Sequence, residues 1–339
     1  MRVVVLGAGG AHKTETSIAR AARASGHRCR LVNVVGWSRY AGPAAPRVVR
    51  YLVEAFEPDF LLLTRHAMLA GEPTLRALTR DRRAAFWYFD PQPKPAVLTL
   101  ARIVGRMYVT YLAQIDGYRA AGVEEVRFLP QGVDPAVDYP APTTRPEYVC
   151  HASFVGSGQY PYRHAVLREV ARACRLQIRG PGWDRDSDLP IAGGPVRGER
   201  LREVIRGARI SLGASAHPEQ DADRASASNR MWKILGCGGF YLGAHVRDIE
   251  HFAVGGRHCA WYRSPSDAVE QTRHYLAAPD ECRRIAEQGR AHALRHHTYA
   301  HRLQLLLAGG EYVLGGDASD DGVIAKLEQP HAGQPLDHL

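Results

Sequence analysis

The stretch Ser228–Ala244, SNRMWKILGCGGFYLGA, predicts an amphipathic helix, a glycine-rich break and a short apolar strand. Small polar residues precede the helix, and Ser228 or Asn229 can cap its first turn. Arg230 and Lys233 lie three residues apart, on one face of that helix. Positive charges beside the free N–H groups of a helix start favour an anion. This segment therefore predicts both a helix–strand unit and an anion site.

Similar helix–strand units recur along the whole chain of 339 residues. In the first half, the apolar runs that predict strands are Val3–Leu6, Cys29–Val35, Phe60–Thr64, Ala85–Phe89, Tyr108–Leu112 and Glu125–Leu129. In the second half they are Val149–Val155, Leu176–Ile178, Ile210–Ala214, Phe240–Leu242 and Ala260–Tyr262. Short buried strands that alternate with helices indicate an α/β fold with parallel, doubly wound sheets.

A proline-rich segment, Pro135–Pro146, divides the two halves and predicts a linker. We expect a first domain at residues 1–138, a second domain at residues 147–308, and a loose tail at residues 309–339. The apolar residues of that tail can dock on the first domain. Two such domains face each other across a cleft, and ligands bind beyond the carboxyl ends of the strands.

The composition is typical of a soluble globular protein, with 45% hydrophobic and 23% charged residues. No run approaches the roughly 20 apolar residues that span a bilayer. The start, MRVVVLGAGG, predicts a strand and not a signal peptide, so we expect a cytoplasmic protein. The net charge of +9 fits an acidic ligand such as a nucleotide-sugar, and it leaves an acidic acceptor or an anionic membrane surface open.

Metal binding and disulfides are not expected. The six cysteines lie far apart, never form CxxC and mostly fall in apolar segments, where a thiol packs as a small hydrophobe. The histidines of His296–His301 stand at a helix junction without a cysteine or carboxylate. A capping Thr298 and favourable charge at a helix end explain them more simply than a metal site.

The glycine-rich turn Gly7–Gly10 follows the first predicted strand and precedes a helix. It lacks the third glycine of the dinucleotide fingerprint, since His12 stands there, and no acidic residue follows the second strand at Asn33. The pattern therefore predicts a tight turn that lets a ligand approach, and it favours this interpretation more than NAD binding. Gly9, His12 and Lys13 would face the cleft.

A second small-residue turn lies in Phe154–Arg163, FVGSGQYPYR. Backbone N–H groups at Gly156 and Ser157 could approach a phosphate without a Cβ clash, and Arg163 could supply the counter-charge. The alternative is an ordinary strand–helix turn with a solvated arginine. Together with the helix that begins at Asn229, this turn predicts a diphosphate site.

The segment GPGW ends another strand and places Gly182 and Trp183 in a loop. An exposed indole there could stack on a base, whereas a buried one would only close the surface of the domain. The residues alone leave both alternatives open.

Three side chains are candidates for catalysis. Asp90, in YFDP, could orient or deprotonate an acceptor hydroxyl, although an Asx-turn explains it as well. His66, after FLLLTR, lies at a comparable strand end. Glu219, with His217 nearby, falls in a long polar loop after Ile210–Ala214, where ligand contacts often occur.

Several motifs occur in a fixed order along Val149–Leu307: FVGSGQYPYR, then IRGPGW, then NRMWKILGCGGFYLGAHVRDIEHF, and then a long helical region that ends in HHTYAHRL. This set resembles the group 1 glycosyltransferases of the spore-maturation-protein CgeB-like type. The segments FWYFDP and GYRAAGVEEVRFLPQGVDP extend the resemblance more weakly into the first half.

The resemblance implies a GT-B fold, in which two Rossmann-like domains face each other across a cleft. It also implies a glycosyltransferase that uses a nucleotide-diphospho-sugar, such as a UDP- or dTDP-sugar, without a metal or other cofactor, and mostly with retention of the anomeric configuration. The first domain would bind the acceptor and the second the donor. By position, the residues that would meet the donor are Gly156, Ser157, Arg163, Gly182, Trp183, Asn229, Arg230 and Lys233.

One position departs from the pattern of many relatives, which place a glutamate where this chain has Lys233. A lysine cannot accept hydrogen bonds from ribose hydroxyls, although it can pair with phosphate. The nucleotide and sugar of the donor therefore stay open.

Two other functions remain as alternatives. A non-hydrolysing nucleotide-sugar epimerase shares the double-Rossmann plan, but it needs a carboxylate cluster, and the carboxylates here are scattered. The lysine at position 233 also leaves room for a non-catalytic nucleotide-binding partner protein. The acceptor and the oligomeric state are not readable from the sequence; protein, glycan, small-molecule aglycone, lipid phosphate and nucleic acid all remain open as acceptors.

Overall fold

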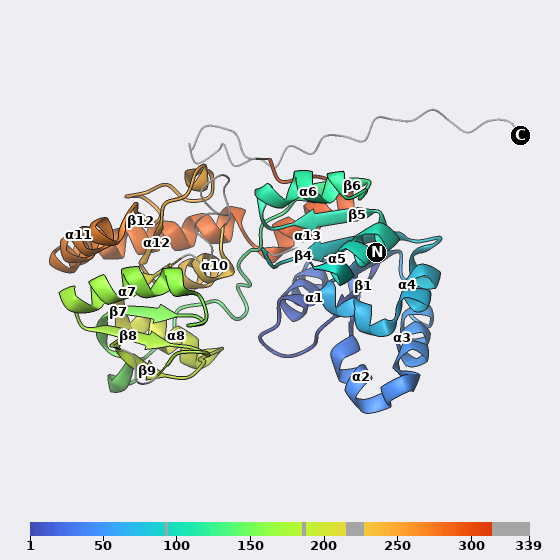
Figure 1. Ribbon diagram of the computed structural model, residues 1–339, viewed down its shortest axis with the longest axis horizontal. Helices are drawn as coiled ribbons and strands as arrows, with labels where there is room; N and C mark the ends of the chain where they lie inside the picture. The colour runs from blue at the N-terminus through green and yellow to red at the C-terminus, as the bar shows by residue number, and fades with distance from the viewer. Residues whose placement is uncertain (92–93, 185–187, 215–226, 314–339) are drawn as a thin grey trace, which may run out of the picture.

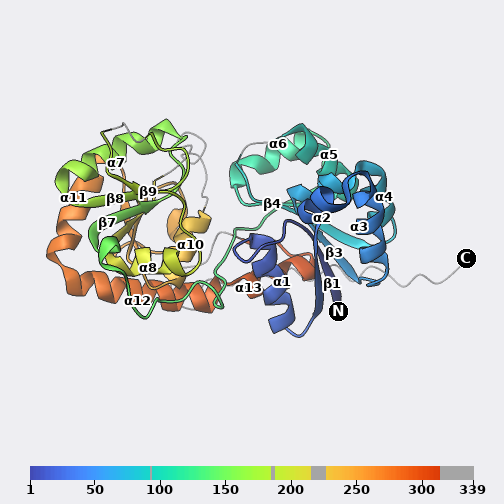
Figure 2. The same cartoon turned by 90° about the horizontal axis from the view of Figure 1, so that it is seen from below.

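The computed structural model describes residues 1–91, 94–184, 188–214 and 227–313. Two lobes lie side by side, and each is built on a parallel six-stranded sheet with helices on its faces (Figures 1 and 2). The predicted α/β class and the doubly wound sheets are therefore confirmed.

The first sheet has the strand order β2-β1-β3-β4-β5-β6. Its strands are β1 (Arg2–Gly7), β2 (Arg28–Asn33), β3 (Phe60–Leu63), β4 (Arg83–Tyr88), β5 (Arg106–Val109) and β6 (Glu125–Phe128). The helices between them are α1 (Thr14–Ala24), α2 (Val34–Ala41), α3 (Ala45–Glu54), α4 (Glu72–Thr79), α5 (Pro95–Val104) and α6 (Ile115–Ala120). The strand order reverses between β1 and β3, which is where doubly wound sheets bind ligands.

The second sheet has the strand order β12-β11-β10-β7-β8-β9. Its strands are β7 (Cys150–Val155), β8 (Leu176–Arg179), β9 (Ile191–Gly193), β10 (Ala208–Leu212), β11 (Tyr241–Ala244) and β12 (Ala260–Tyr262). Its helices are α7 (Pro161–Ala173), α8 (Glu199–Gly207), α10 (Asn229–Gly236), α11 (Pro265–Ala277) and α12 (Pro279–His296). Short 3₁₀ helices lie at Gly42–Ala44, Arg65–Ala70, Leu112–Gln114, Pro146–Tyr148 and Ile249–His251.

Central strands are apolar without alternation because helices cover both faces of each sheet. In β1, Val3, Val4 and Val5 are fully buried, and so are Phe60 and Leu62 of β3. A parallel sheet that is covered on both faces requires such continuous apolar runs, which is why the strands could be found in the sequence.

The last helix, α13 (Tyr299–Ala308), returns to the first lobe and packs against α1 (Figures 1 and 2). At the crossing, Val133 N donates to His297 O at 2.7 Å, and Tyr299 N donates to Val133 O at 3.0 Å. Arg302, fully buried, donates from Nε to Pro130 O at 3.0 Å. Helix α13 thus leaves the second lobe, although the sequence places residues 147–308 in one domain.

The first residues of the tail also contact the first sheet. Tyr312 N donates to Phe128 O at 3.1 Å, and Tyr108 Oη donates to Gly310 O at 3.1 Å. The remaining tail residues, 314–339, lie outside the described part of the chain.

Some predicted boundaries differ from the structure for local reasons. The second strand ends at Asn33 and not at Val35, because Asn33 caps α2 by accepting from Gly36 N at 3.0 Å. The fifth strand ends at Val109, before the expected Leu112. The sequence reading also missed α2, α5, α6 and β9, which are short or carry proline or glycine.

All six cysteines lie in the described ranges, and each is a free thiol. The described residues contain no group of three side chains that could hold a metal ion. None of the helices in this part of the chain combines the length and the apolar character that crossing a bilayer needs.

Candidate functional site

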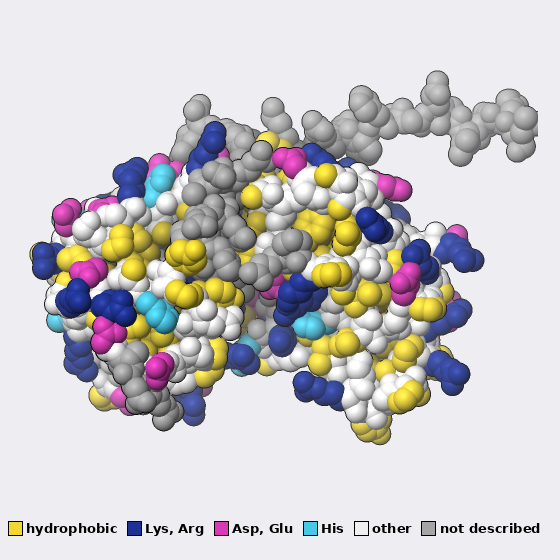
Figure 3. Space-filling view, in the orientation of Figure 1, with side chains coloured by type: hydrophobic (Ala, Val, Ile, Leu, Met, Phe, Trp, Pro, Cys, Tyr) yellow, Lys and Arg dark blue, Asp and Glu magenta, His cyan; other side chains and the backbone are white. Residues whose placement is uncertain are grey.

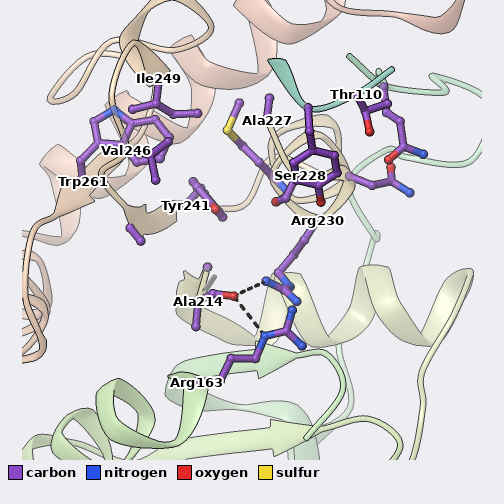
Figure 4. Close-up of a pocket in the computed structure, with 16 residues that line it drawn as sticks. Thr110, Arg163, Ala214, Ala227, Ser228, Arg230, Tyr241, Val246, Ile249 and Trp261 are labelled. Carbon is purple, nitrogen blue, oxygen red and sulfur yellow. Dashed lines mark hydrogen bonds between the residues drawn. The ribbon is translucent and has the colours of Figure 1, made fainter. Parts of the chain in front are cut away.

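A cavity of about 260 Å³ lies between the two lobes. Its first-lobe wall is formed by Thr110, Tyr111 and Gln131, which follow β5 and β6. The second-lobe wall contains the start of α10 and the residues that follow β10 and β11, with Tyr241 and Trp261 at one side (Figure 4). Both walls stand at the carboxyl ends of parallel strands, as expected for a ligand site in such sheets.

Two arginines converge in this cavity from different helices (Figure 4). Arg163 Nε and Arg230 Nη1 each donate to the Ala214 carbonyl at 3.2 Å. Arg163 Nη1 also donates to Ser157 O at 2.8 Å, and Arg230 Nε to Val155 O at 2.8 Å. Backbone carbonyls thus hold two guanidinium groups side by side, which favours an anion beside them.

Arg163 is 7% exposed, and Arg230, the second centre of this charge, is partly buried. Burial lowers the pKa of Arg230, but a guanidinium remains protonated in proteins. The Cζ atom of Arg230 lies 4.5 Å from the centre of the Phe154 ring. Among the described residues, Arg230 makes no ion pair with a carboxylate. Backbone carbonyl dipoles and an aromatic ring surround this positive charge without neutralising it, so it attracts a negative ligand.

The glycine loop after β7 comes very close to these arginines. A Cβ on Gly156 would lie 2.5 Å from Arg230 Nη2, and one on Gly158 would lie 2.5 Å from Gly182 O. The backbone N–H groups of Gly156 and Gly158 donate to Arg179 O and Pro181 O, both at 2.9 Å. Glycine therefore serves close packing here, and its N–H groups are engaged within the chain.

Trp183 packs beneath the same loop. Its Nε1 donates to Gly156 O at 2.8 Å, and its ring stacks on His164 at a centroid distance of 5.2 Å. The indole thus packs against the loop while the side chain stays partly exposed. Its stacking on a base stays a prediction. Gly182, next to it, has a positive φ of 69°, which favours glycine.

The start of α10 borders the cavity as the sequence predicts. Ser228 caps the helix, with Oγ accepting from Met231 N at 3.3 Å. Asn229 lines the cavity, and its Oδ1 is a buried atom without a hydrogen-bond partner among the described residues. An amide oxygen in this state can accept a hydrogen bond from a ligand hydroxyl.

Lys233 of α10 does not line this first cavity. Its Nζ is 3.3 Å from Oδ1 of Asp138, a residue of the segment between the lobes that is 4% exposed. Burial raises the pKa of Asp138, although the charge of Lys233 acts against this. Lys233 borders a second cavity of about 210 Å³, which shares Arg230 with the first. Lys233 is therefore paired with Asp138, and it shares the second cavity, not the first, with Arg230.

In the first lobe, the turn after β1 is held by Asn33. Gly9 N donates to Asn33 Oδ1 at 2.8 Å, and a Cβ on Gly9 would lie 2.7 Å from Asn33 Cγ. His12 reaches the second lobe, since a Cβ on Gly198 would lie 2.5 Å from His12 Cε1. Lys13 is the residue that precedes α1.

The catalytic candidates of the first lobe each have a partner that the sequence reading missed. Asp90 forms an ion pair with Arg65, and both side chains are partly exposed. His66 Nδ1 lies 3.2 Å from Glu15 Oε1. In the sequence, the only indication of Glu15 is that it is an acidic residue in the first turn of the first helix. Glu219 and His217 lie outside the described residues.

On the face in Figure 3, Lys and Arg side chains are spread over both lobes among acidic side chains. We therefore define the candidate site by the geometry of Arg163 and Arg230.

Comparison with solved structures shows the fold of GT-B glycosyltransferases. Sucrose-phosphate synthase from Thermosynechococcus elongatus is 12% identical, with 91% of this chain and 98% of that chain covered and a TM-score of 0.61. Anabaena HepE in complex with UDP-glucose is 12% identical, with 91% and 99% covered and a TM-score of 0.63. AviGT4, a glycosyltransferase involved in avilamycin A biosynthesis, is 18% identical, with 91% and 98% covered and a TM-score of 0.55.

Within this fold, residues 163–308 match the family model described as glycosyl transferase-like. The match runs from α7 to the end of α13 and contains both arginines of the cavity. No curated protein sequence matches the chain. The CgeB-like subgroup stays a prediction.

Proposed function

We propose that this chain is a glycosyltransferase that moves a sugar from a nucleotide-diphospho-sugar to an acceptor. The observation that carries the proposal is the convergence of Arg163 and Arg230 on one carbonyl in the cavity between the lobes. The glycosyl transferase-like match of residues 163–308 supports it, and so does the fold shared with a protein whose structure contains UDP-glucose. In this proposal the second lobe binds the donor and the first lobe the acceptor.

The chemistry required of the protein is mainly electrostatic. When the bond between the sugar and the diphosphate breaks, negative charge develops on the leaving oxygen. Arg163, Arg230 and the N–H groups at the start of α10 would stabilise that charge, because they are fixed in place before the reaction. The Oδ1 atom of Asn229 would accept a hydrogen bond from a donor hydroxyl.

The proposal includes metal independence, since two guanidinium groups would take the role of a divalent cation on the diphosphate. It also includes the retention of anomeric configuration that the family resemblance implies. Unchanged activity in excess EDTA and an NMR assignment of the product anomer test these two parts separately. Loss of activity in EDTA that Mg²⁺ restores would reject the first part.

Binding of UDP, measured by calorimetry, tests the diphosphate site. We expect Arg163→Ala and Arg230→Ala each to weaken UDP binding by about 1–3 kcal/mol, as for a lost hydrogen bond to a charged group. Arg50→Ala is the control, because Arg50 is exposed on α3 and pairs with Glu54. Unchanged affinity in both arginine variants would reject the site.

Turnover separates an enzyme from a binding protein. We expect the wild-type chain to hydrolyse UDP-glucose or a dTDP-sugar slowly without an acceptor, because water can replace the acceptor hydroxyl. Tight UDP binding without release of sugar from any nucleotide-sugar would favour the non-catalytic alternative.

A further inference from the structure

A buried carboxylate lies where the strand order of the first sheet reverses. Glu15 is in the first turn of α1, which follows β1, and it is 3% exposed. Thr64 and His66 follow β3, the strand on the other side of this reversal. The crevice at such a position is the usual ligand site of a doubly wound sheet.

Glu15 is held by three donors. Its Oε1 accepts from Ala8 N at 3.2 Å and from Thr64 Oγ1 at 2.9 Å, and it lies 3.2 Å from His66 Nδ1. Burial raises the pKa of Glu15, but hydrogen bonds from His66, from backbone N–H groups and from Thr64 outweigh it, and the pKa lies below its ordinary value. The carboxylate is therefore ionised at neutral pH.

An ionised carboxylate accepts hydrogen bonds and cannot donate them. The hydrogen between Glu15 and His66 must therefore belong to Nδ1 of the imidazole. In the neutral ring, this leaves Nε2 with a free lone pair. The His66 side chain is 26% exposed, and its Nε2 makes no hydrogen bond with the described residues.

The edge of the sheet that carries His66 faces the second lobe. His12, in the turn after β1, contacts Gly198, and Gln131, which follows β6, lines the cavity with Arg230. In a parallel sheet, all the carboxyl ends lie at one edge, so the end of β3 belongs to this same wall.

We propose that His66 Nε2 accepts a hydrogen bond from a hydroxyl group of the acceptor substrate, and that Glu15 is the positioning residue that fixes the imidazole for this contact. The inference rests on the proposed glycosyl transfer. The ligand group must be a hydrogen donor, as an acceptor hydroxyl is, because a fixed lone pair on a partly buried side chain rejects a group without one. The contact orients the acceptor oxygen and does not make His66 a base. When that oxygen bonds to the sugar and the bond between sugar and diphosphate breaks, the hydroxyl proton passes to the oxygen of the departing diphosphate.

The tautomer of His66 gives a test that does not depend on turnover. Two-bond ¹H–¹⁵N correlation spectra distinguish a ring protonated at Nδ1 from one protonated at Nε2, and His66→Gln assigns the signals. We expect the Nδ1–H form in the wild-type chain and a shift toward Nε2–H in Glu15→Gln, because the amide does not demand a donor. An Nε2–H form in the wild-type chain would overturn the proposal.

Hydrolysis of UDP-glucose tests the contact itself, with water as the smallest hydroxyl acceptor. We expect His66→Phe to lower kcat at least tenfold and Glu15→Gln to lower it by a smaller factor, while KM for UDP-glucose changes less than twofold in both. The control is His27→Phe, because His27 lies between α1 and β2, at the opposite edge of the sheet, and we expect it to keep the wild-type rate.

The outcomes separate this inference from the proposed function. Unchanged kcat in His66→Phe, with UDP binding and hydrolysis intact, overturns the inference alone. Absence of binding of both UDP and dTDP in the wild-type chain overturns both. Loss of UDP affinity in His66→Phe would place this histidine on the donor and would also overturn the inference.

Discussion

The two walls of the cleft hold their polar side chains in opposite ways. In the second lobe, backbone carbonyls hold two cations, Arg163 and Arg230, whose charge is directed at a ligand. In the first lobe, a buried anion, Glu15, holds the imidazole of His66. The guanidinium groups border the cavity, whereas the carboxylate is enclosed. We therefore expect the second-lobe wall to suit an anionic ligand and the first-lobe wall to suit a hydroxyl group.

Removal of the enclosed anion should have the largest effect. We expect Glu15→Leu to lower the free energy of unfolding by about 2–5 kcal/mol, because the buried donors Ala8 N and Thr64 Oγ1 lose their acceptor. Urea unfolding measures this. The control is Glu54→Leu, whose exposed ion pair with Arg50 should contribute only about 0–1 kcal/mol. Equal losses in the two variants would show that Glu15 is not a structural anchor.

Displacement of a cation that lines the cavity should act on binding instead. In Gly156→Ala the new Cβ would lie 2.5 Å from Arg230 Nη2, so the guanidinium must move. We expect UDP affinity, measured by calorimetry, to fall by about 1–3 kcal/mol, as for a lost charged hydrogen bond. The control is Gly194→Ala, where the new Cβ meets nothing within 4 Å. Wild-type affinity in Gly156→Ala would mean that Arg230 does not touch the ligand.

A variant of Lys233 tests whether this third cation of the second lobe also contacts the ligand. We expect Lys233→Met to lower the free energy of unfolding by about 1–2 kcal/mol, because Asp138 stays buried without its partner while Lys233 is itself partly exposed. UDP affinity should change less than twofold. The double variant Lys233→Met/Asp138→Leu should regain most of the stability. A tenfold loss of UDP affinity would instead assign Lys233 to the phosphate.

The smallest expected effect is the contribution of Glu15, in the first lobe, to the dependence of stability on pH. The pKa of Glu15 is lowered in the folded chain, so its contribution is present above the ordinary glutamate pKa of about 4.3 and is lost as pH falls through the folded value. Between pH 6 and pH 3.5, the free energy of unfolding in urea should therefore fall more for the wild-type chain than for Glu15→Gln. An equal loss would contradict an ionised Glu15.

The parts of the site that could be predicted are those in which neighbours in sequence are neighbours in space. The cap at Ser228, the cavity position of Arg230 and the glycine loop at Gly156 follow from helix spacing and from a strand end. The roles of Lys233 and His66 could not be predicted, because their partners lie 95 and 51 residues away along the chain.

The sequence by itself determined the α/β class and most of the strands, because strands buried on both faces require unbroken apolar runs. It also predicted an anion site at the start of α10, because two charges three residues apart share a helical face. Only the tertiary structure decided that α13 packs on the first lobe, that Asp138 engages Lys233, and that Glu15 fixes the imidazole of His66. These contacts join segments that are distant in the sequence. Their geometry depends on how those segments pack in the folded chain, and a local sequence pattern does not encode that packing.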